Sequence, residues 1–391
     1  MKTKQKLYTS ISVGAKAAAF VLLMLVTACG AQEDPDVEKE DKLQLSDQEI
    51  TLGVDGWNSM TSSRATIFES SDDIVKESNN KGGGNFKLFA YLRETNATFI
   101  GGSRVWYFVP KGATIGTWEF YDETNNTFPQ YFWPQNNSVD FFAYMPWVKN
   151  GGPTNISMGD YDSATGQSIS CQMQAETTLV DTDGQETLIA YAKNKSKSDK
   201  SVDMHFVHPF SAISFELSQA HRNLTINWIR FNNIYLKGTT TLEDATRGNT
   251  TIEWTPQDSP GTFKISVEKT IPDDINFGGE IGGPYLVMPQ DLTKGTTDDE
   301  LDDVTMTIEY KWDNADKDNN DDDIPGDEDP DLKNDIYRIT RSITTGRLKE
   351  WIAGKKYTYV LYLGNNEAEI LFKVKVEDWD EINYDHIIDL E

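Results

Sequence analysis

Strict alternation of apolar and polar side chains is the feature that most limits how this chain can fold. In four segments of the second half every other residue is apolar, with mostly polar neighbours: residues 213–217, 263–267, 304–312 and 370–376. A period of two puts successive side chains on opposite faces of a strand, so these segments predict strands with one buried face. Shorter runs of strand character occur in the first half at residues 50–54, 86–92, 104–109, 117–121 and 139–147.

Many short strands joined by turn residues favour an all-β fold of packed antiparallel sheets. Glycine-rich clusters such as residues 81–84 lie between the runs and are typical of turns. One short helix is also predicted. Leu348, Trp351 and Ile352 would share one helical face, and Gly354 could end the helix in a left-handed conformation.

The first 28 residues have the organisation of an export signal. Three lysines within the first six residues form a positive start, and residues 17–26 form an apolar run that is too short to span a bilayer core of about 30 Å. The run closes on Val26-Thr27-Ala28-Cys29, where small residues precede a cysteine. This pattern resembles a bacterial lipobox, which implies cleavage before Cys29 and an outer-membrane lipid partner held through its acylated thiol and amino group.

The charge balance and the short motifs exclude several classes of function. A formal net charge of −27 repels phosphate backbones, so nucleic acid is not an expected partner. Two cysteines, one of them in the export signal, exclude a disulfide framework. No HExxH, GxSxG, CxxC or P-loop spacing occurs, so neither enzymatic activity nor a cofactor is expected.

No metal site is predicted from the residue spacings. His205 and His208 are three residues apart, which places them on opposite faces of a strand. The acidic run 313–335 has oxygen ligands at alternating positions, but it lacks the glycine and the spaced glutamate of an EF-hand. We interpret this run as an exposed loop between two strands, with calcium binding as the alternative. Cys171 stands alone and is expected to be packed.

Six stretches of the body together resemble the fimbrillin family, the subunits of type V pili in Bacteroidetes. They are residues 140–147 (DFFAYMPW), 186–191 (ETLIAY), 202–213 (VDMHFVHPFSAI), 285–290 (YLVMPQ), 351–359 (WIAGKKYTY) and 374–379 (VKVEDW). The resemblance rests on their order and spacing behind the lipobox. Residues 209–212 depart from the family pattern, which usually has a small and a basic residue there.

The resemblance implies two tandem transthyretin-like antiparallel β-sandwich domains. The chain then divides into a signal peptide, a lipidated acidic linker, an N-terminal sandwich and a C-terminal sandwich with a donor-strand-like tail: residues 1–28, 29–47, 48–200 and 201–391. The lysine- and serine-rich stretch 192–201 marks the boundary between the sandwiches. Two domains also agree with a typical size of about 150 residues per domain.

The resemblance further implies assembly by donor-strand exchange. In that scheme an arginine-specific protease cuts the surface lipoprotein, its first strand leaves, and an extended segment of the next subunit fills the groove. The candidate removable strand is the alternating run of Ile50, Leu52 and Val54. The candidate cut lies between Arg64 and Ala65, next to small polar residues that a protease could enter. The alternative is that Arg64 is an ordinary surface arginine.

The C-terminal tail supplies the candidate donor strand. It has an alternating face of Ile382, Tyr384, His386, Ile388 and Leu390. Donor strands bind through main-chain hydrogen bonds while alternate side chains fill pockets, and this tail has the pattern that such binding needs. The alternative is that the tail is the last strand of its own domain.

We therefore expect a non-enzymatic pilus subunit at the outer membrane and cell surface, with other pilus subunits as partners in a homo- or heteropolymer. Adhesion follows from the family alone. An anchor subunit, which would keep its lipid, or a tip subunit is the alternative within the family. A glycan-binding surface lipoprotein is the alternative from another class, and the tryptophans to check for exposure are Trp106, Trp118, Trp133 and Trp147.

Overall fold

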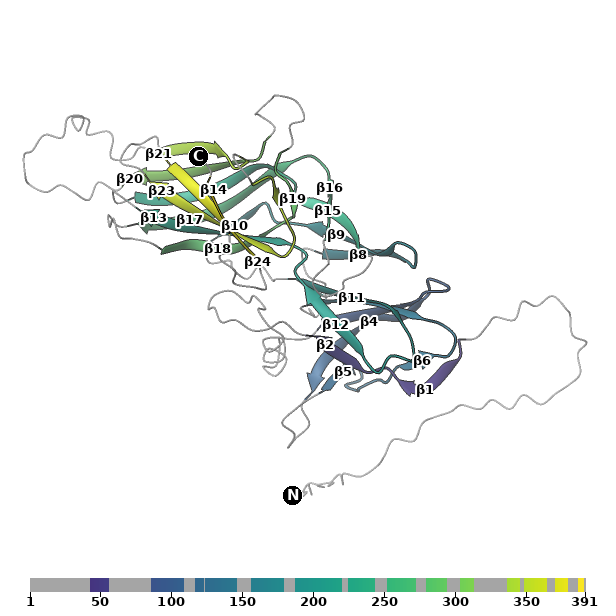
Figure 1. The fold of residues 1–391 in the computed structure, drawn as a ribbon. Coiled ribbons are helices and arrows are strands. Elements are labelled where there is room, and N and C mark those ends of the chain that lie inside the picture. Colours follow the sequence, from purple (N-terminus) through teal and green to yellow (C-terminus); the bar gives the residue numbers. More distant parts are fainter. Residues whose placement is uncertain are drawn as a thin grey trace, which may run out of the picture. The chain divides into compact units, whose positions relative to one another are not determined.

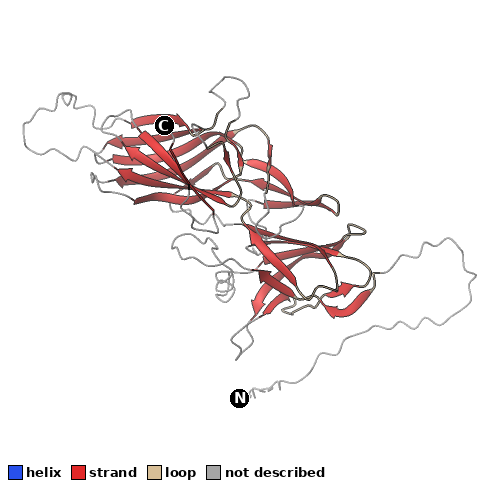
Figure 2. Ribbon diagram, viewed as in Figure 1, coloured by secondary structure: helices blue, strands red, loops and turns tan. Residues whose placement is uncertain are grey.

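The computed structural model describes fourteen stretches of the chain. They are residues 43–55, 86–108, 117–122, 124–145, 156–178, 187–219, 224–242, 252–271, 279–293, 303–312, 336–344, 348–363, 370–378 and 386–389. Within them the regular elements are strands and no helix occurs (Figure 2), which confirms the predicted all-β class. A helix long and apolar enough to cross a membrane is accordingly not found among these residues.

Seven strands of the N-terminal part close into a barrel (Figure 1). Their order around it is β11-β12-β2-β5-β4-β3-β7, and β7 pairs back to β11. The strands are β2 (Leu52–Asp55), β3 (Phe86–Leu92), β4 (Thr98–Phe108), β5 (Thr117–Tyr121), β7 (Val139–Met145), β11 (Leu188–Lys195) and β12 (Val202–Val207). In β3 buried and half-buried residues alternate as the sequence predicts, because one face lines the barrel core.

Strand β7 departs from that alternation because both of its faces are packed. Phe141 and Ala143 lie in the barrel core, whereas Phe142 and Tyr144 lie in a second cluster together with residues of another sheet. That sheet has the order β16-β15-β9-β8 and consists of β8 (Ile156–Asp162), β9 (Gly166–Gln172), β15 (Lys237–Leu242) and β16 (Thr255–Gln257). A strand buried on both faces is apolar throughout, which explains the continuous run FFAYM.

Strand pairing crosses the expected division between residues 200 and 201. Strand β12 follows that boundary and pairs with β11 and β2 in the barrel. Strand β9 precedes the boundary and pairs with β15, and β10 (Glu176–Thr178) pairs in parallel with β17 (Gly261–Ile271). The division into two tandem domains at this point therefore stays a prediction.

The C-terminal part is a sandwich of two five-stranded sheets around one core. The first sheet has the order β10-β17-β14-β20-β21 and the second β18-β13-β23-β24-β25. The remaining strands of the two sheets are β13 (Ser211–Gln219), β14 (Leu224–Ile234), β18 (Gly279–Val287), β20 (Thr305–Trp312), β21 (Ile336–Ser342), β23 (Lys355–Leu363), β24 (Ile370–Asp378) and β25 (His386–Asp389). The apolar faces predicted around Phe215, Ile265, Ile308 and Val374 are buried in this core.

The predicted helix near Trp351 is wrong. Residues 350–351 form β22 (Glu350–Trp351), which pairs with β19 (Gln290–Asp291). Trp351 is 1% exposed and donates its indole N–H to the hydroxyl of Tyr359 over 3.1 Å. Ile352, which should have shared its face, is exposed. Burial of Trp351 in the sandwich outweighs the weak local helix preference, although Gly354 does adopt the predicted left-handed conformation with φ of 71°.

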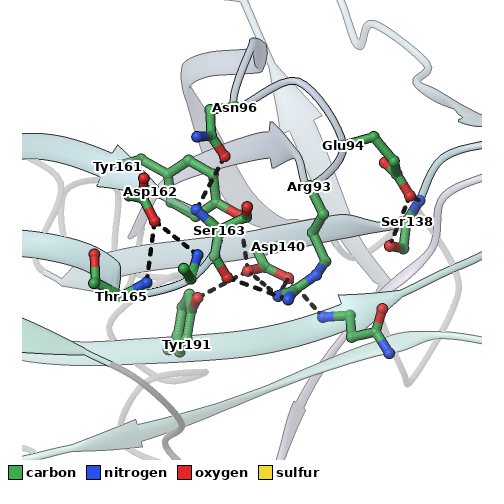
Figure 3. A network of polar contacts seen from close by, with 12 residues as sticks. Arg93, Glu94, Asn96, Ser138, Asp140, Tyr161, Asp162, Ser163, Thr165 and Tyr191 are labelled. Atoms are coloured by element: carbon green, nitrogen blue, oxygen red, sulfur yellow. Dashed lines mark hydrogen bonds and ion pairs between the residues drawn. The ribbon is translucent and has the colours of Figure 1, made fainter.

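A buried carboxylate holds the barrel and the β8–β9 hairpin together (Figure 3). Asp140 of β7 is 0% exposed, and its Oδ2 accepts hydrogen bonds from Arg93 Nη1 at 2.7 Å and from the hydroxyls of Tyr161 and Tyr191 at 2.9 Å. Its Oδ1 accepts a hydrogen bond from the backbone N–H of Asn194 at 2.6 Å. These donors come from the β3–β4 turn, β8 and β11, so one side chain fastens four segments.

The chemistry of this network keeps its donors protonated. Burial, followed by the interactions with Asp140, raises the pKa of Tyr161 and of Tyr191 well above the ordinary tyrosine range. The hydrogen bond to Asp140 likewise raises the pKa of Arg93. Because a buried charge is costly unless it is paired and hydrogen-bonded, loss of the Asp140 charge leaves Arg93 without its partner.

We predict that Asp140→Asn lowers the free energy of unfolding by about 3 kcal/mol, the low end of the range for breaking a buried ion pair, because Arg93 stays 23% exposed to water. Urea-induced unfolding measures the change. The matched control is Glu94→Gln, an exposed carboxylate beside Arg93 that bonds Ser138 and should cost less than about 1 kcal/mol. Equal costs for the two variants would contradict the account.

Candidate functional site: the strand that closes the barrel

The N-terminal segment enters the fold as two short strands. β1 (Leu45–Glu49) pairs with β6 (Phe132–Pro134) in a separate two-stranded sheet, and β2 enters the barrel. β1 thus begins within the expected linker of residues 29–47, and the expected strand is interrupted, because Ile50 lies between β1 and β2. The backbone N–H of Ile50 donates to the carbonyl of Tyr131 over 2.8 Å.

The three residues of the candidate removable strand all contact the barrel core. Ile50 is 2% exposed, and Leu52 and Val54 are half-buried against the same cluster. Full burial of an isoleucine contributes about 1.5–3 kcal/mol. The segment therefore occupies a position in the barrel wall between β12 and β5, which we call the slot. Its burial is modest for a strand of a barrel.

The two sides of β2 are unequally paired. All four of its residues pair in parallel with residues 202–205 of β12, and the backbone N–H of Val202 also donates to the carbonyl of Thr51 over 2.9 Å. On the other side, within the described residues, pairing with β5 occurs at Leu52 and Trp118. Among the described residues, the junction of β2 with β5 thus has fewer register pairs than the other junctions of the barrel.

A close approach between β2 and β12 requires a glycine at position 53. A Cβ added at Gly53 would lie 3.2 Å from Cγ and 3.7 Å from Cα of Asp203, its register partner. The hydroxyl of Ser201 donates to Asp203 Oδ1 over 2.7 Å and orients this carboxylate toward the glycine. Sequence reasoning missed this contact, although a glycine that interrupts an alternating strand is a known sign of close backbone approach.

The described part of the tail lies at a sheet edge. β25 pairs antiparallel with β24, with Ile388 opposite Val374 and His386 opposite Val376. β25 is the last strand of its sheet, so the described tail is neither central in the sandwich nor part of the barrel. Three other residues of the candidate donor strand lie outside the described residues: Ile382, Tyr384 and Leu390.

Several predicted site residues also fall outside the described stretches. These are Cys29, Arg64, Ala65, Trp147 and the acidic run 313–335. Among the residues that are described, no group of three histidine, cysteine or acidic side chains could hold a metal ion. Cys171 is buried, and burial raises the pKa of its thiol to about 12, so it stays an unreactive thiol.

The tryptophans considered for sugar stacking belong mainly to the core. Trp133 is 1% exposed, and Trp118 packs against the barrel cluster. The ring of Trp106 meets Tyr121 edge-on at 5.1 Å, with the guanidinium of Arg104 at 5.2 Å from its centroid. Trp133 is therefore buried, whereas Trp106 and Trp118 are half-buried, and none of these three side chains is fully exposed.

Comparison with known proteins gives one family and a set of solved structures. A family model described as fimbrillin-like matches residues 73–379. A fimbrial protein from Bacteroides vulgatus is 14% identical with a TM-score of 0.50, covering 85% of this chain and 100% of its own. The tip fimbrial protein Mfa3 from Porphyromonas gingivalis, with C-terminal truncation, is 9% identical with a TM-score of 0.37, covering 85% of this chain and 100% of its own.

No curated protein matches the sequence. The structural likeness to the Bacteroides vulgatus protein shows a shared fold. The family match extends from residue 73 to residue 379 and so includes most of the chain, from ahead of β3 to just past β24. On this ground the chain belongs to the fimbrillin-like family.

Proposed function

We propose that this protein is a pilus subunit that reaches the cell surface as a lipoprotein acylated on Cys29 and polymerises by exchanging β2 for a strand of the next subunit. The observation that carries the proposal is the position of β2. It closes a barrel, and the segment that supplies it precedes the candidate cut between Arg64 and Ala65. A cut there would separate β1, β2 and the lipid from the rest of the chain.

The cut would act by lowering the effective concentration of β2 at its slot. While the chain is continuous, β2 is tethered beside its slot, and short tethers give effective concentrations on the order of millimolar. After the cut, β2 belongs to a separate peptide that is held by four parallel backbone pairs with β12, one pair with β5, the pairing of β1 with β6 and the burial of Ile50. Such a peptide can dissociate and be diluted, whereas before the cut it returns to its slot.

The emptied slot would then need a new strand. Loss of β2 exposes the backbone edges of β12 and β5 and part of the barrel core around Ile50. Unpaired strand edges of this kind are a strong template for pairing with another chain. The tail from Ile382 to Leu390 is the proposed donor, because β25 already lies at a sheet edge, from which it can detach without disturbing central strands. An arginine-specific protease and other pilus subunits are the implied partners.

Two other roles use the same parts. An anchor subunit would keep its lipid on Cys29 and its β2, and a tip subunit would present its outer surface to a receptor. Both roles fit the fimbrillin-like family, and the fate of the bond after Arg64 separates an anchor subunit from a stalk subunit. Adhesion would be a property of the assembled pilus in each case.

We predict that an arginine-specific protease cuts the folded precursor after Arg64 and that oligomers follow. Arg64→Ala should abolish both the cut and the oligomers, because the peptide that carries β2 then stays attached. Mass spectrometry of the fragments and size-exclusion chromatography with light scattering measure the two steps. Arg341→Ala, which changes an exposed arginine of β21, is the matched control and should behave as the parent chain.

We predict that a disulfide between β2 and β12 blocks assembly. Gly53 and Asp203 are register partners on adjacent strands, and a Gly53 Cβ would lie 3.2 Å from Asp203 Cγ and 3.7 Å from Asp203 Cα. Because the Asp203 Cβ is bonded to both of these atoms, the two Cβ atoms lie near the separation of about 3.5–4.5 Å that a disulfide needs. The oxidised double variant, cut after Arg64, should keep its N-terminal peptide and stay monomeric, and reduction should restore assembly. The single variant Asp203→Cys is the control. Polymerisation of the oxidised double variant at the parent rate would exclude exchange at β2.

We predict that deletion of residues 382–391 leaves cleavage intact and abolishes polymerisation, because the acceptor slot remains while the donor is lost. Mixing this variant with the oxidised Gly53→Cys/Asp203→Cys variant should give dimers and no longer species. One partner would then supply a tail and the other a slot. If the tail-deleted chain polymerises alone, the donor strand lies elsewhere.

A further inference from the structure

A tryptophan surrounded by cations lies on the outer face of the sheet β10-β17-β14-β20-β21. The guanidinium of Arg230 lies 5.1 Å from the ring centroid of Trp228, that of Arg338 lies 5.8 Å from it, and the ammonium of Lys264 lies 6.0 Å from it. These distances are within the range of cation–π attraction. In a chain with a net charge of −27, three cations gathered on one aromatic ring form an unusual local surface.

A β-bulge places Trp228 on this outer face. The register of β14 shifts between Ile226 and Trp228 against both of its neighbouring strands. Ile226 and Ile229 are both buried in the sandwich core. Strict alternation from Ile226 would turn Trp228 inward, but the extra residue Asn227 turns it outward, toward Arg230. Bulges that redirect a side chain are over-represented beside functional sites.

One carboxylate of the surface is already satisfied. Glu309 of β20 accepts hydrogen bonds from Arg338 Nε at 2.7 Å and from the side-chain amide of Asn227 at 3.2 Å. Burial raises the pKa of Glu309, but the hydrogen bonds from Arg338 and Asn227 outweigh burial and leave the pKa below its ordinary value. Glu309 therefore stays ionised and neutralises Arg338.

Among the described residues, Arg230 keeps a donor without an acceptor, and Lys264 lies beside it. Arg230 and Lys264 are register partners on adjacent strands. The Nε of Arg230 is buried and has no hydrogen-bond partner within the described stretches. The exposed Glu176 is the register neighbour of Lys264 at the sheet edge. A buried donor without an acceptor is costly, and an anion that reaches it would relieve that cost.

Polar side chains beside Arg230 and Lys264 suit the binding of a sugar. The side-chain amide of Asn232 donates to the hydroxyls of Thr305 at 3.0 Å and Thr307 at 3.1 Å, and Thr307 shares a hydrogen bond of 2.9 Å with Thr340. Thr307 is 4% exposed and its hydroxyl is used within this network. The accessible polar groups next to Arg230 are therefore those of the exposed Thr340 and of the half-buried Asn232 and Thr305. Such groups pair with sugar hydroxyls, whereas an acidic peptide would make most of its contacts through charge alone.

We propose that this outer face binds a carboxylate-bearing glycan, such as a chain of uronic acids, with the carboxylate held between Arg230 and Lys264. Arginine binds carboxylates through paired N–H donors, and these charge-assisted bonds are about twice as strong as neutral ones. The proposal goes beyond pilus assembly and is independent of it, because the sheet involved does not contain β2 or β25.

The test is calorimetric titration of the uncut full chain with a short oligogalacturonate and with its methyl ester. The acid should bind saturably and more weakly as salt rises, and the ester should bind at least about tenfold more weakly because the charge–charge contact is lost. Arg230→Gln and Lys264→Gln should each weaken binding of the acid about tenfold, and Arg230→Lys should fall between Arg230→Gln and the parent. Thermal unfolding checks that each variant is folded.

The matched control is Lys373→Gln, which removes a lysine 5.8 Å from the ring of Tyr362 on the other sheet and should leave binding unchanged. Absence of saturable binding at millimolar acid, equal binding of the ester, or full binding by both glutamine variants would overturn the proposal. Binding of a poly-aspartate peptide in place of the oligogalacturonate would also overturn it. If the parent chain binds no sugar and cut Arg230→Gln chains fail to polymerise, the proposal is also overturned, since the occupant would then be a second copy.

Discussion

Main-chain pairing of β2 with β12 on one side and with β5 on the other keeps the barrel closed, and the proposed assembly depends on that pairing. The pairing is asymmetric, with four register partners on β12 and a seam at Leu52 and Trp118. A strand that is needed for closure but held modestly can be removed once its tether is cut. The same strand stays in place while the tether gives it a high local concentration. Stability before the cut and exchange after it therefore follow from one geometry.

The rest of the barrel is fastened independently of β2. Asp140 joins β7 to β8, β11 and the β3–β4 turn through hydrogen bonds from four residues. The cluster around Phe142 and Tyr144 packs the same strand against the sheet β16-β15-β9-β8. None of these contacts involves residues 45–55. We infer that the barrel keeps most of its structure when β2 leaves, which preserves a defined slot for an incoming strand.

The alternation of apolar and polar residues predicted the strands that have one buried face. It missed the features that depend on partners far along the chain. The strands at residues 86–92 and 117–121 were predicted at their observed bounds, because their inward faces meet one core. The helix at Trp351 was wrong because burial against Tyr359 decides the local conformation. The outward turn of Trp228 depends on a bulge against two neighbouring strands, and the glycine at position 53 depends on Asp203, far along the chain. Neither partner can be identified from one sequence, whereas membership of the fimbrillin-like family could be, from the order of its motifs.

The most direct measurement is a cryo-electron microscopy structure of the polymer formed from chains cut after Arg64. The account predicts that the slot between β12 and β5 holds a strand contributed by another copy, with no density for residues 45–55 of the same subunit. A polymer in which Leu52 still pairs with Val202 of its own subunit would contradict it.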